Sequence, residues 1–127
     1  MLTVAAAVLR RGDQVLVARR ASGQRHAGRW EFPGGKLESA ETPEQCLVRE
    51  LREEMNAEIE VGSYIARAVH DYGRGPIEVL AFEAKLLSKE LQLTVHDEVR
   101  WCRVEELSGV DLVDADIAIV NALKAHA

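Results

Sequence analysis

The sequence has few residues of the kinds that build disulfide-rich or metal-finger domains. It contains two cysteines among 127 residues, Cys46 and Cys102, and they do not form a CxxC pair. Two thiols are too few for a disulfide framework, so we expect both to be reduced. The four histidines show neither HxxxH nor HExxH spacing, which argues against a zinc site, and we expect them at the surface. They are His26, His70, His96 and His126.

The short motifs of several enzyme classes are also missing. The sequence has no GxSxG nucleophile elbow, no GxxxxGK[ST] phosphate-binding loop and no GxGxxG dinucleotide-binding turn. These absences exclude the usual signatures of serine hydrolases, P-loop enzymes and dinucleotide-dependent oxidoreductases. Any enzymatic chemistry must therefore rest on another arrangement of residues.

Neither a long apolar run nor an excess of positive charge is present. The apolar segment 2–9 is too short to span a bilayer and no basic stretch precedes it, so we expect no membrane association and a cytoplasmic location. The 21 acidic residues outnumber the 16 basic ones, for a net charge of -5, which argues against binding to a nucleic-acid duplex. A small anionic ligand would then need a metal ion or a local basic patch.

What remains is the composition of an ordinary globular domain, with 47% hydrophobic and 29% charged residues. The length suits one hydrophobic core. No repeat, low-complexity run or linker interrupts the chain. We therefore expect residues 1–127 to form one domain, as a monomer or a homodimer.

Apolar and alternating segments predict a sheet that uses both halves of the chain. Strands are predicted over residues 2–9, 14–18, 30–32, 57–66, 77–86 and 99–104. The polar segment 19–29 is predicted to be a loop that carries four arginines, and segment 33–35 a sharp turn. A helical turn is predicted near residues 105–107.

Local signals predict a central helix. Thr42 can cap it, Pro43 suits its first turn, and Gln45 completes a capping box. We expect the helix to end near Met55, because Asn56 tolerates the left-handed conformation that closes many helices.

A final helix is predicted after Asp114, which can cap it. Its apolar residues recur at spacings of three or four, namely Ile117, Ala118, Val120 and Leu123. Strands on both sides of the central helix, with a terminal helix, predict an α/β domain of the α+β type, in which a mixed sheet lies between helices.

Three glutamates lie on one face of the predicted central helix. Glu50, Glu53 and Glu54 are spaced i, i+3 and i+4, so their like charges repel unless a cation neutralises them. Oxygen ligands favour a hard cation such as Mg²⁺ or Mn²⁺. The alternative is a solvated helix face whose glutamates pair with Arg49 and Arg52.

The spacing around these glutamates favours the first interpretation. Five residues separate Gly35 from Glu41, seven more precede Arg49, and residues 50–54 read ELREE. This run resembles the Nudix box, Gly-x5-Glu-x7-Arg-Glu-U-x-Glu-Glu-x-Gly-U, where U is apolar. Asn56 stands where the box has glycine, and asparagine can make the same left-handed helix end.

The resemblance extends beyond the box. Arg20 and the segments 30–35 (WEFPGG) and 98–101 (EVRW) resemble the MutT-type branch of the family. The resemblance implies the Nudix fold, a Mg²⁺ cofactor that Mn²⁺ can replace, and a water that attacks the β-phosphorus of a nucleoside triphosphate. The products would be a nucleoside monophosphate and pyrophosphate.

The resemblance also implies a set of metal ligands. These are the Gly34 carbonyl and the carboxylates of Glu50, Glu53 and Glu54. Some carboxylate must take the proton of the attacking water, and Glu50 is favoured. Glu98 is the alternative base or an additional ligand, and Asp97 could take its place. Both are equally consistent with solvated loop charges.

In the family, the pair formed by Arg49 and Glu41 braces the loop against the helix and orients the catalytic groups. Arg20 is a candidate contact to phosphate or base, or a solvated surface arginine. Phe32 packs against a nucleobase or in the core. Asp116 reads the base edge or stabilises the start of the final helix.

The function that the resemblance implies is a nucleotide-sanitising pyrophosphohydrolase that acts on 8-oxo-dGTP or on (d)CTP-type nucleotides. An aspartate at position 116 looks closer to the cytidine-triphosphate subgroup, since guanine readers of this type more often carry asparagine there. Alternatives are hydrolysis of another nucleoside diphosphate derivative, such as ADP-ribose or NADH, and a non-catalytic module that binds a nucleotide. The intact glutamates argue against the last.

Overall fold

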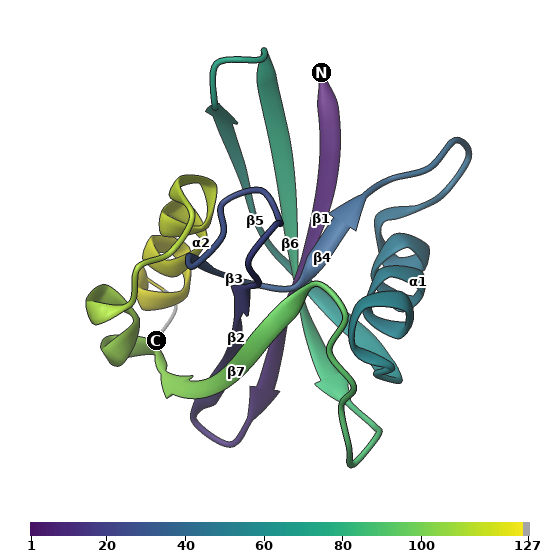
Figure 1. The fold of residues 1–127 in the computed structure, drawn as a ribbon, viewed down its shortest axis with the longest axis vertical. Helices are drawn as coiled ribbons and strands as arrows, with labels where there is room; N and C mark the ends of the chain where they lie inside the picture. Colours follow the sequence, from purple (N-terminus) through teal and green to yellow (C-terminus); the bar gives the residue numbers. More distant parts are fainter. Residues whose placement is uncertain (126–127) are drawn as a thin grey trace.

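The computed structural model describes residues 1–125, in which one mixed sheet lies between two helices (Figure 1). In chain order the elements are β1 (Leu2–Arg11), β2 (Gln14–Arg20), β3 (Trp30–Glu31), β4 (Gly34–Lys36), α1 (Pro43–Met55), β5 (Ile59–Asp71), β6 (Pro76–Leu86), β7 (His96–Arg103), the 3-10 helix η1 (Val104–Gly109) and α2 (Asp114–Ala125). The predicted α+β architecture is confirmed.

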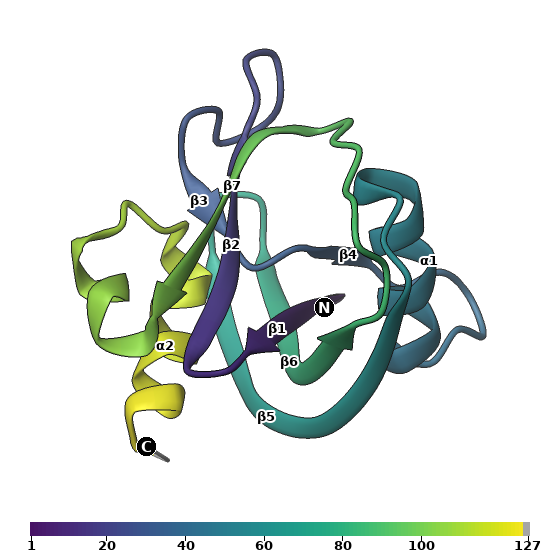
Figure 2. The ribbon, with the colours of Figure 1, turned by 90° about the horizontal axis from the view of Figure 1, so that it is seen from below.

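Strand β1 is the centre of the sheet. The main path runs β3-β2-β1-β6-β5, while β4 pairs with β1 and β7 pairs with β2. β1 and β6 are parallel, with Leu2 opposite Ile77, and the other named strands pair antiparallel. Figures 1 and 2 show α1 and α2 on opposite sides of this sheet.

The side chains of β1 alternate between two cores, because successive residues of a strand point to opposite faces. Ala5, Ala7 and Leu9 pack in the core that α1 covers, whereas Ala6 and Val8 pack in the core that α2 covers. A strand that is buried on both faces reads as a continuous apolar run, which is how residues 2–9 appear in the sequence.

Helix α1 has the predicted bounds and the predicted caps. The Thr42 hydroxyl accepts the Gln45 backbone N–H at 3.1 Å, and the Gln45 side chain accepts the Thr42 N–H at 3.0 Å. The helix ends at Asn56, which is left-handed with a φ of 51°. Both ends of the helix are therefore fixed by residues within its own sequence.

Two segments predicted as loop and turn are partly strand. β2 continues through Arg19 and Arg20, because both residues pair with β7. Residues 34–36 form β4 alongside β1. A Cβ on Gly34 would lie 1.9 Å from the Ala5 carbonyl oxygen, so the absence of a side chain at Gly34 permits this close approach.

Several boundaries also differ from the prediction. β5 runs to Asp71 and β7 begins at His96, since each has a partner strand that holds its polar residues in register. Irregular register between Val61 and Ala66 breaks the alternation that marks a strand in the sequence. Asp114 is the first residue of α2 rather than a cap before it.

Cys46 and Cys102 are buried free thiols, without a disulfide bond, and each lies in a different core. No helix within residues 1–125 is long and apolar enough to cross a membrane.

Candidate active site

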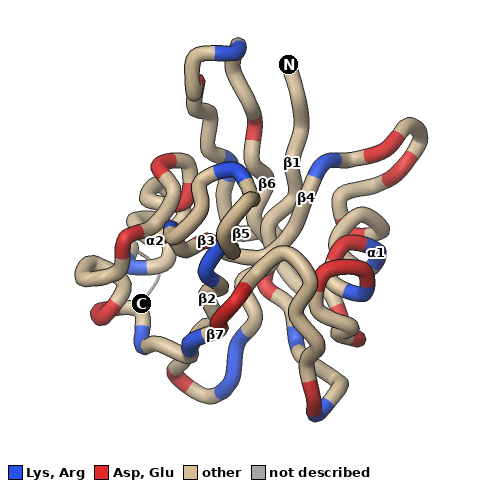
Figure 3. Tube along the Cα trace, viewed as in Figure 1, with Lys and Arg blue, Asp and Glu red and all other residues tan. Residues whose placement is uncertain are grey.

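Helix α1 brings its three glutamates to one side of the molecule. Glu50, Glu53 and Glu54 line a cavity of about 410 Å³ together with Gly34 and Gly35 of β4. Figure 3 shows acidic residues gathered on α1 and on the loop before it. The predicted ligand residues are therefore brought together, on a rigid helix and the strand that faces it.

The three carboxylates differ in exposure. Glu53 is largely exposed, Glu50 is half-buried and Glu54 is buried. Burial, and then a hydrogen bond with Glu50 and the charge of Glu31, raise the pKa of Glu54 to about 9. A divalent cation would relieve this crowding of acidic groups, because it favours their ionised forms. The donor set, all oxygen, fits a hard cation.

Gly35 makes room for the Glu50 carboxylate. A Cβ on Gly35 would lie 2.4 Å from the carboxylate carbon of Glu50 and 2.6 Å from its Oε2. Any side chain at position 35 would therefore displace this carboxylate. The glycine of the sequence motif lets the Glu50 carboxylate keep this position.

Arg49 ties the loop before α1 to the helix. Its guanidinium donates to both Glu41 oxygens at 2.8 Å, to Glu50 Oε1 at 2.9 Å and to the Lys36 carbonyl at 3.1 Å. The Arg49 hydrogen bond is the largest of the effects that lower the pKa of Glu41 to about 2. These contacts link the loop, Arg49 and the Glu50 carboxylate, and the bracing role of Arg49 and Glu41 stays a prediction.

Two further residues lie beside Glu54, and the sequence did not single them out. Glu31, Glu54 and His96 offer possible ligand atoms that all lie within 4.8 Å of one another. His96 Nε2 is 2.8 Å from Glu31 Oε2, and its Nδ1 is buried without a partner among the described residues. The prediction of a surface histidine is thus wrong for His96, which is buried and contacts Glu31.

The other histidines lie away from the carboxylates of α1. His26 and His70 are half-buried on either side of Tyr72, with ring centroids 4.8 and 4.3 Å from the tyrosine ring. His126 lies outside the described residues. His96 differs from the other described histidines by its contact with Glu31. The sequence could not single it out, because the spacing of the histidines matches no motif.

Arg20 lines the same cavity as the glutamates, but protein groups occupy its guanidinium. It donates to Glu31 Oε2 at 2.9 Å, to the Arg25 carbonyl at 2.5 Å and to the Gln24 side chain at 3.5 Å. Arg20 therefore holds the loop that follows β2 and the Glu31 carboxylate. A contact from Arg20 to substrate stays a prediction.

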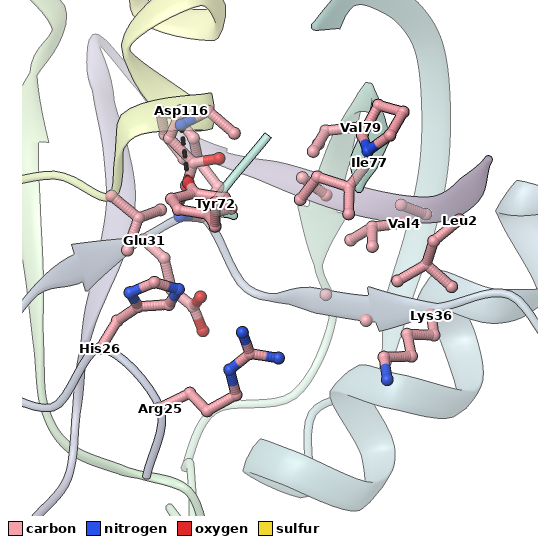
Figure 4. Close-up of a pocket in the computed structure, with 18 of the residues that line it drawn as sticks. Leu2, Val4, Arg25, His26, Glu31, Lys36, Tyr72, Ile77, Val79 and Asp116 are labelled. Atoms are coloured by element: carbon pink, nitrogen blue, oxygen red, sulfur yellow. Dashed lines mark hydrogen bonds between the residues drawn. The ribbon is translucent and has the colours of Figure 1, made fainter. Parts of the chain in front are cut away.

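Phe32 and Asp116 meet at the far end of a second, larger cavity of about 510 Å³, which also reaches Gly34 and Gly35. The Phe32 backbone N–H donates to Asp116 Oδ2 at 2.8 Å. Burial raises the pKa of Asp116 to about 8. Figure 4 shows Asp116 and Tyr72 together at one end of this cavity and Lys36 at the other.

Glu98 and Asp97 lie apart from the α1 carboxylates. Both are on β7, where Arg19 contacts Asp97 at 2.7 Å and Glu98 at 3.4 Å. Neither lines the two cavities described above. The structure therefore does not bring the alternative base to the predicted ligands.

A family model for the NUDIX domain matches residues 1–122. The chain belongs to the NUDIX family. This membership accounts for the sheet between two helices and for the glutamate-bearing helix next to the glycines of β4, and it makes the protein a Nudix hydrolase by family.

Named relatives cover nearly all of the Nudix chain. The CTP pyrophosphohydrolase of Escherichia coli K12 is 38% identical over 125 residues, which are 98% of this chain and 93% of that protein. The putative 8-oxo-dGTP diphosphatase 2 of Mycobacterium tuberculosis is 38% identical and covers 91% of this chain and 82% of its own length. The solution structure of the E. coli ORF135 protein superposes with a TM-score of 0.86 at 37% identity, covering 98% of this chain and 89% of that one.

Proposed function

We propose that this protein is a Mg²⁺-dependent nucleoside triphosphate pyrophosphohydrolase that acts on (d)CTP-type nucleotides or on 8-oxo-dGTP. The observation that carries the proposal is that two neighbouring cavities share the lining residues Gly34 and Gly35. One holds the acidic groups that suit a metal bound to a phosphate chain, and the other has a volume of about 510 Å³ for the nucleobase. A single nucleotide can therefore occupy both.

Glu50, Glu53, Glu54 and the Gly34 carbonyl would hold Mg²⁺. When bound, Mg²⁺ neutralises phosphate charge and activates a water for attack. Glu50 is the base that we favour, because Arg49 fixes one of its oxygens at 2.9 Å and Gly35 leaves the space in which the carboxylate lies. Arg49 acts on the reaction through Glu50.

The base would bind at the end of the larger cavity that Phe32 and Asp116 line together. At neutral pH an aspartic acid with a pKa of about 8 is mostly protonated, so its side chain offers one donor and one acceptor. Cytosine presents the complementary pair, the N3 acceptor and the N4 donor. The N1–H and O6 of an 8-oxoguanine base also match this pair, so the two substrate classes named for the relatives share this recognition chemistry.

The test is release of pyrophosphate by the intact protein with Mg²⁺ across CTP, dCTP, 5-methyl-dCTP, dGTP and 8-oxo-dGTP. ADP-ribose and NADH serve as the competing substrate class. Release of pyrophosphate from none of the triphosphates, together with cleavage of ADP-ribose, would overturn the proposal. Absence of turnover with any compound, despite nucleotide binding, would favour a non-catalytic module.

A variant tests the metal site. Glu53→Gln keeps the size of the side chain and removes its charge, and we expect kcat to fall on the order of 100-fold or more. Glu44→Gln, on the same helix but outside the cavity, is the matched control and should retain activity. Unchanged turnover by Glu53→Gln would refute the assignment of Glu53 as a ligand.

A further inference from the structure

The loop between β2 and β3 leaves one arginine unneutralised. The segment 19–29 carries four arginines, and three of them, Arg19, Arg20 and Arg29, contact carboxylates at 2.7 to 3.2 Å. The guanidinium of Arg25 contacts no carboxylate of residues 1–125, and its side chain is exposed. The chain has a net charge of -5, so acidic residues are abundant, yet none of those in residues 1–125 pairs with Arg25.

The backbone that carries Arg25 is nevertheless held in place. The Arg25 carbonyl accepts the Arg20 Nε–H at 2.5 Å, and the N–H of Gly28 donates to the Arg20 carbonyl at 2.8 Å. The adjacent ring of His26 packs against Tyr72, with centroids 4.8 Å apart. The loop is therefore fixed at both its β2 end and its outer side, while the guanidinium of Arg25 remains available.

The free guanidinium lies along the path that a nucleotide would take. Arg25 lines the larger cavity together with Asp116 at one end and Lys36 at the other. Figure 4 shows the Arg25 side chain pointing into the space between Glu31 and Lys36, on the side of α1. Lys36 and Arg74, which also line this cavity, are likewise without a carboxylate partner among the described residues, so Arg25 is one of three unpaired cations along it.

We propose that Arg25 is a substrate-binding residue that contacts the phosphate chain of the nucleotide. This inference rests on the proposed function, since it requires the base to occupy the Phe32 and Asp116 end. A guanidinium forms paired, charge-assisted hydrogen bonds with phosphate oxygens. Its positive charge also offsets the repulsion between the phosphates and the glutamates of α1.

The test measures binding separately from turnover. EDTA removes the metal that hydrolysis requires, so binding can be measured without turnover. Calorimetry in EDTA would follow the binding of CTP and of cytidine to the wild type, Arg25→Ala and Arg25→Lys. We expect Arg25→Ala to weaken CTP binding about 10-fold and to leave cytidine binding unchanged, and Arg25→Lys to recover part of the loss. With Mg²⁺, KM for CTP should rise by a similar factor while kcat stays within about twofold.

Lys124→Gln is the control for net charge, because Lys124 is exposed near the end of α2 and lines neither cavity. Equal weakening by Lys124→Gln and Arg25→Ala would overturn the proposal, and so would CTP affinity within twofold of the wild type in a folded Arg25→Ala. If the wild type binds CTP but hydrolyses no triphosphate, the proposed function fails, while the affinity difference still decides the role of Arg25.

Discussion

Glu54 and Asp116 are two carboxyls whose pKa values are raised chiefly by burial, to about 9 and about 8. Their surroundings differ in a way that separates their proposed roles. Glu54 lies next to Glu50 and Glu31, so a cation can neutralise several acids at once. Asp116 is held by one backbone N–H from Phe32, and a neutral carboxyl suits it because no cation of residues 1–125 pairs with it.

The raised pKa of Asp116 predicts a pH dependence of stability. An unfolded aspartate releases its proton near 3.8, whereas the folded one keeps it until about pH 8. The free energy of unfolding should therefore fall as pH rises from about 4 to about 8. Asp116→Asn removes the titrating carboxyl. The melting temperature of this variant relative to wild type should therefore rise between about pH 4 and about pH 8, and the full change in the free energy of unfolding is on the order of several kcal/mol.

Thermal unfolding of both proteins from pH 4 to pH 9 measures this effect, with Asp13→Asn in the exposed hairpin turn as the matched control. A difference between Asp116→Asn and wild type that is constant with pH would show that Asp116 is not protonated in the folded state above pH 4.

At the scale of the element, α1 is a helix whose ends are fixed locally and whose acidic face is fixed by Arg49. The arginine spans from Glu41 in the preceding loop to Glu50 and Glu53 on the helix. Its planar group makes two parallel bonds to Glu41, a geometry that lysine cannot reproduce. The position of Glu50 therefore depends on the shape of this side chain as well as on its charge.

Arg49→Lys should consequently lower kcat/KM by about 10- to 100-fold, the usual effect of losing a group that orients metal ligands. The Mg²⁺ concentration for half-maximal rate should also rise. Arg52→Lys is the control, because Arg52 is exposed and its guanidinium pairs, among the described residues, with Glu58 at 3.5 Å. Equal rates and equal Mg²⁺ dependence for Arg49→Lys and wild type would contradict the bracing role.

The sequence was sufficient to predict α1, because its start, its end and its acidic face depend on neighbours within a few residues. Thr42, Gln45 and Asn56 behave as their local chemistry predicts. β4 was not predictable in the same way, since a strand that begins with two glycines exists only because β1 accepts it.

The same distinction applies to the site. The glutamates of α1 were found from their spacing, whereas Glu31 and His96 meet only because β2 pairs with both β3 and β7. The segment 19–29 was predicted as a loop that carries four arginines. Pairing with acids distant in the sequence divides it, and leaves Arg25 as its free cation among the described residues. Such contacts have no signature in one sequence.

At the scale of the whole molecule, the sheet separates two cores that share β1. Leu51 of α1 is fully buried in one core and Ile119 of α2 in the other. Truncation of either leaves a cavity, and each of Leu51→Ala and Ile119→Ala should reduce the free energy of unfolding by about 2 to 5 kcal/mol.

Because the two cores lie on opposite faces, the double variant should lose the sum of the two losses to within about 0.5 kcal/mol. Chemical denaturation with urea measures all three variants, and Val48→Ala, at an exposed position on α1, is the control. A double variant that departs from the sum by more than about 1 kcal/mol would indicate that the cores are mechanically coupled through β1.

The parallel pairing of β1 with β6 has a consequence for the order in which the protein assembles. Leu2 pairs with Ile77 and Arg10 with Lys85. One edge of β1 therefore has no hydrogen-bonding partner until β6 has been made. During synthesis, α1 and its glutamates leave the ribosome before that partner exists, and closing so long a loop is slow. The proposed metal ligands on α1 are therefore made before the strand that completes the pairing of β1.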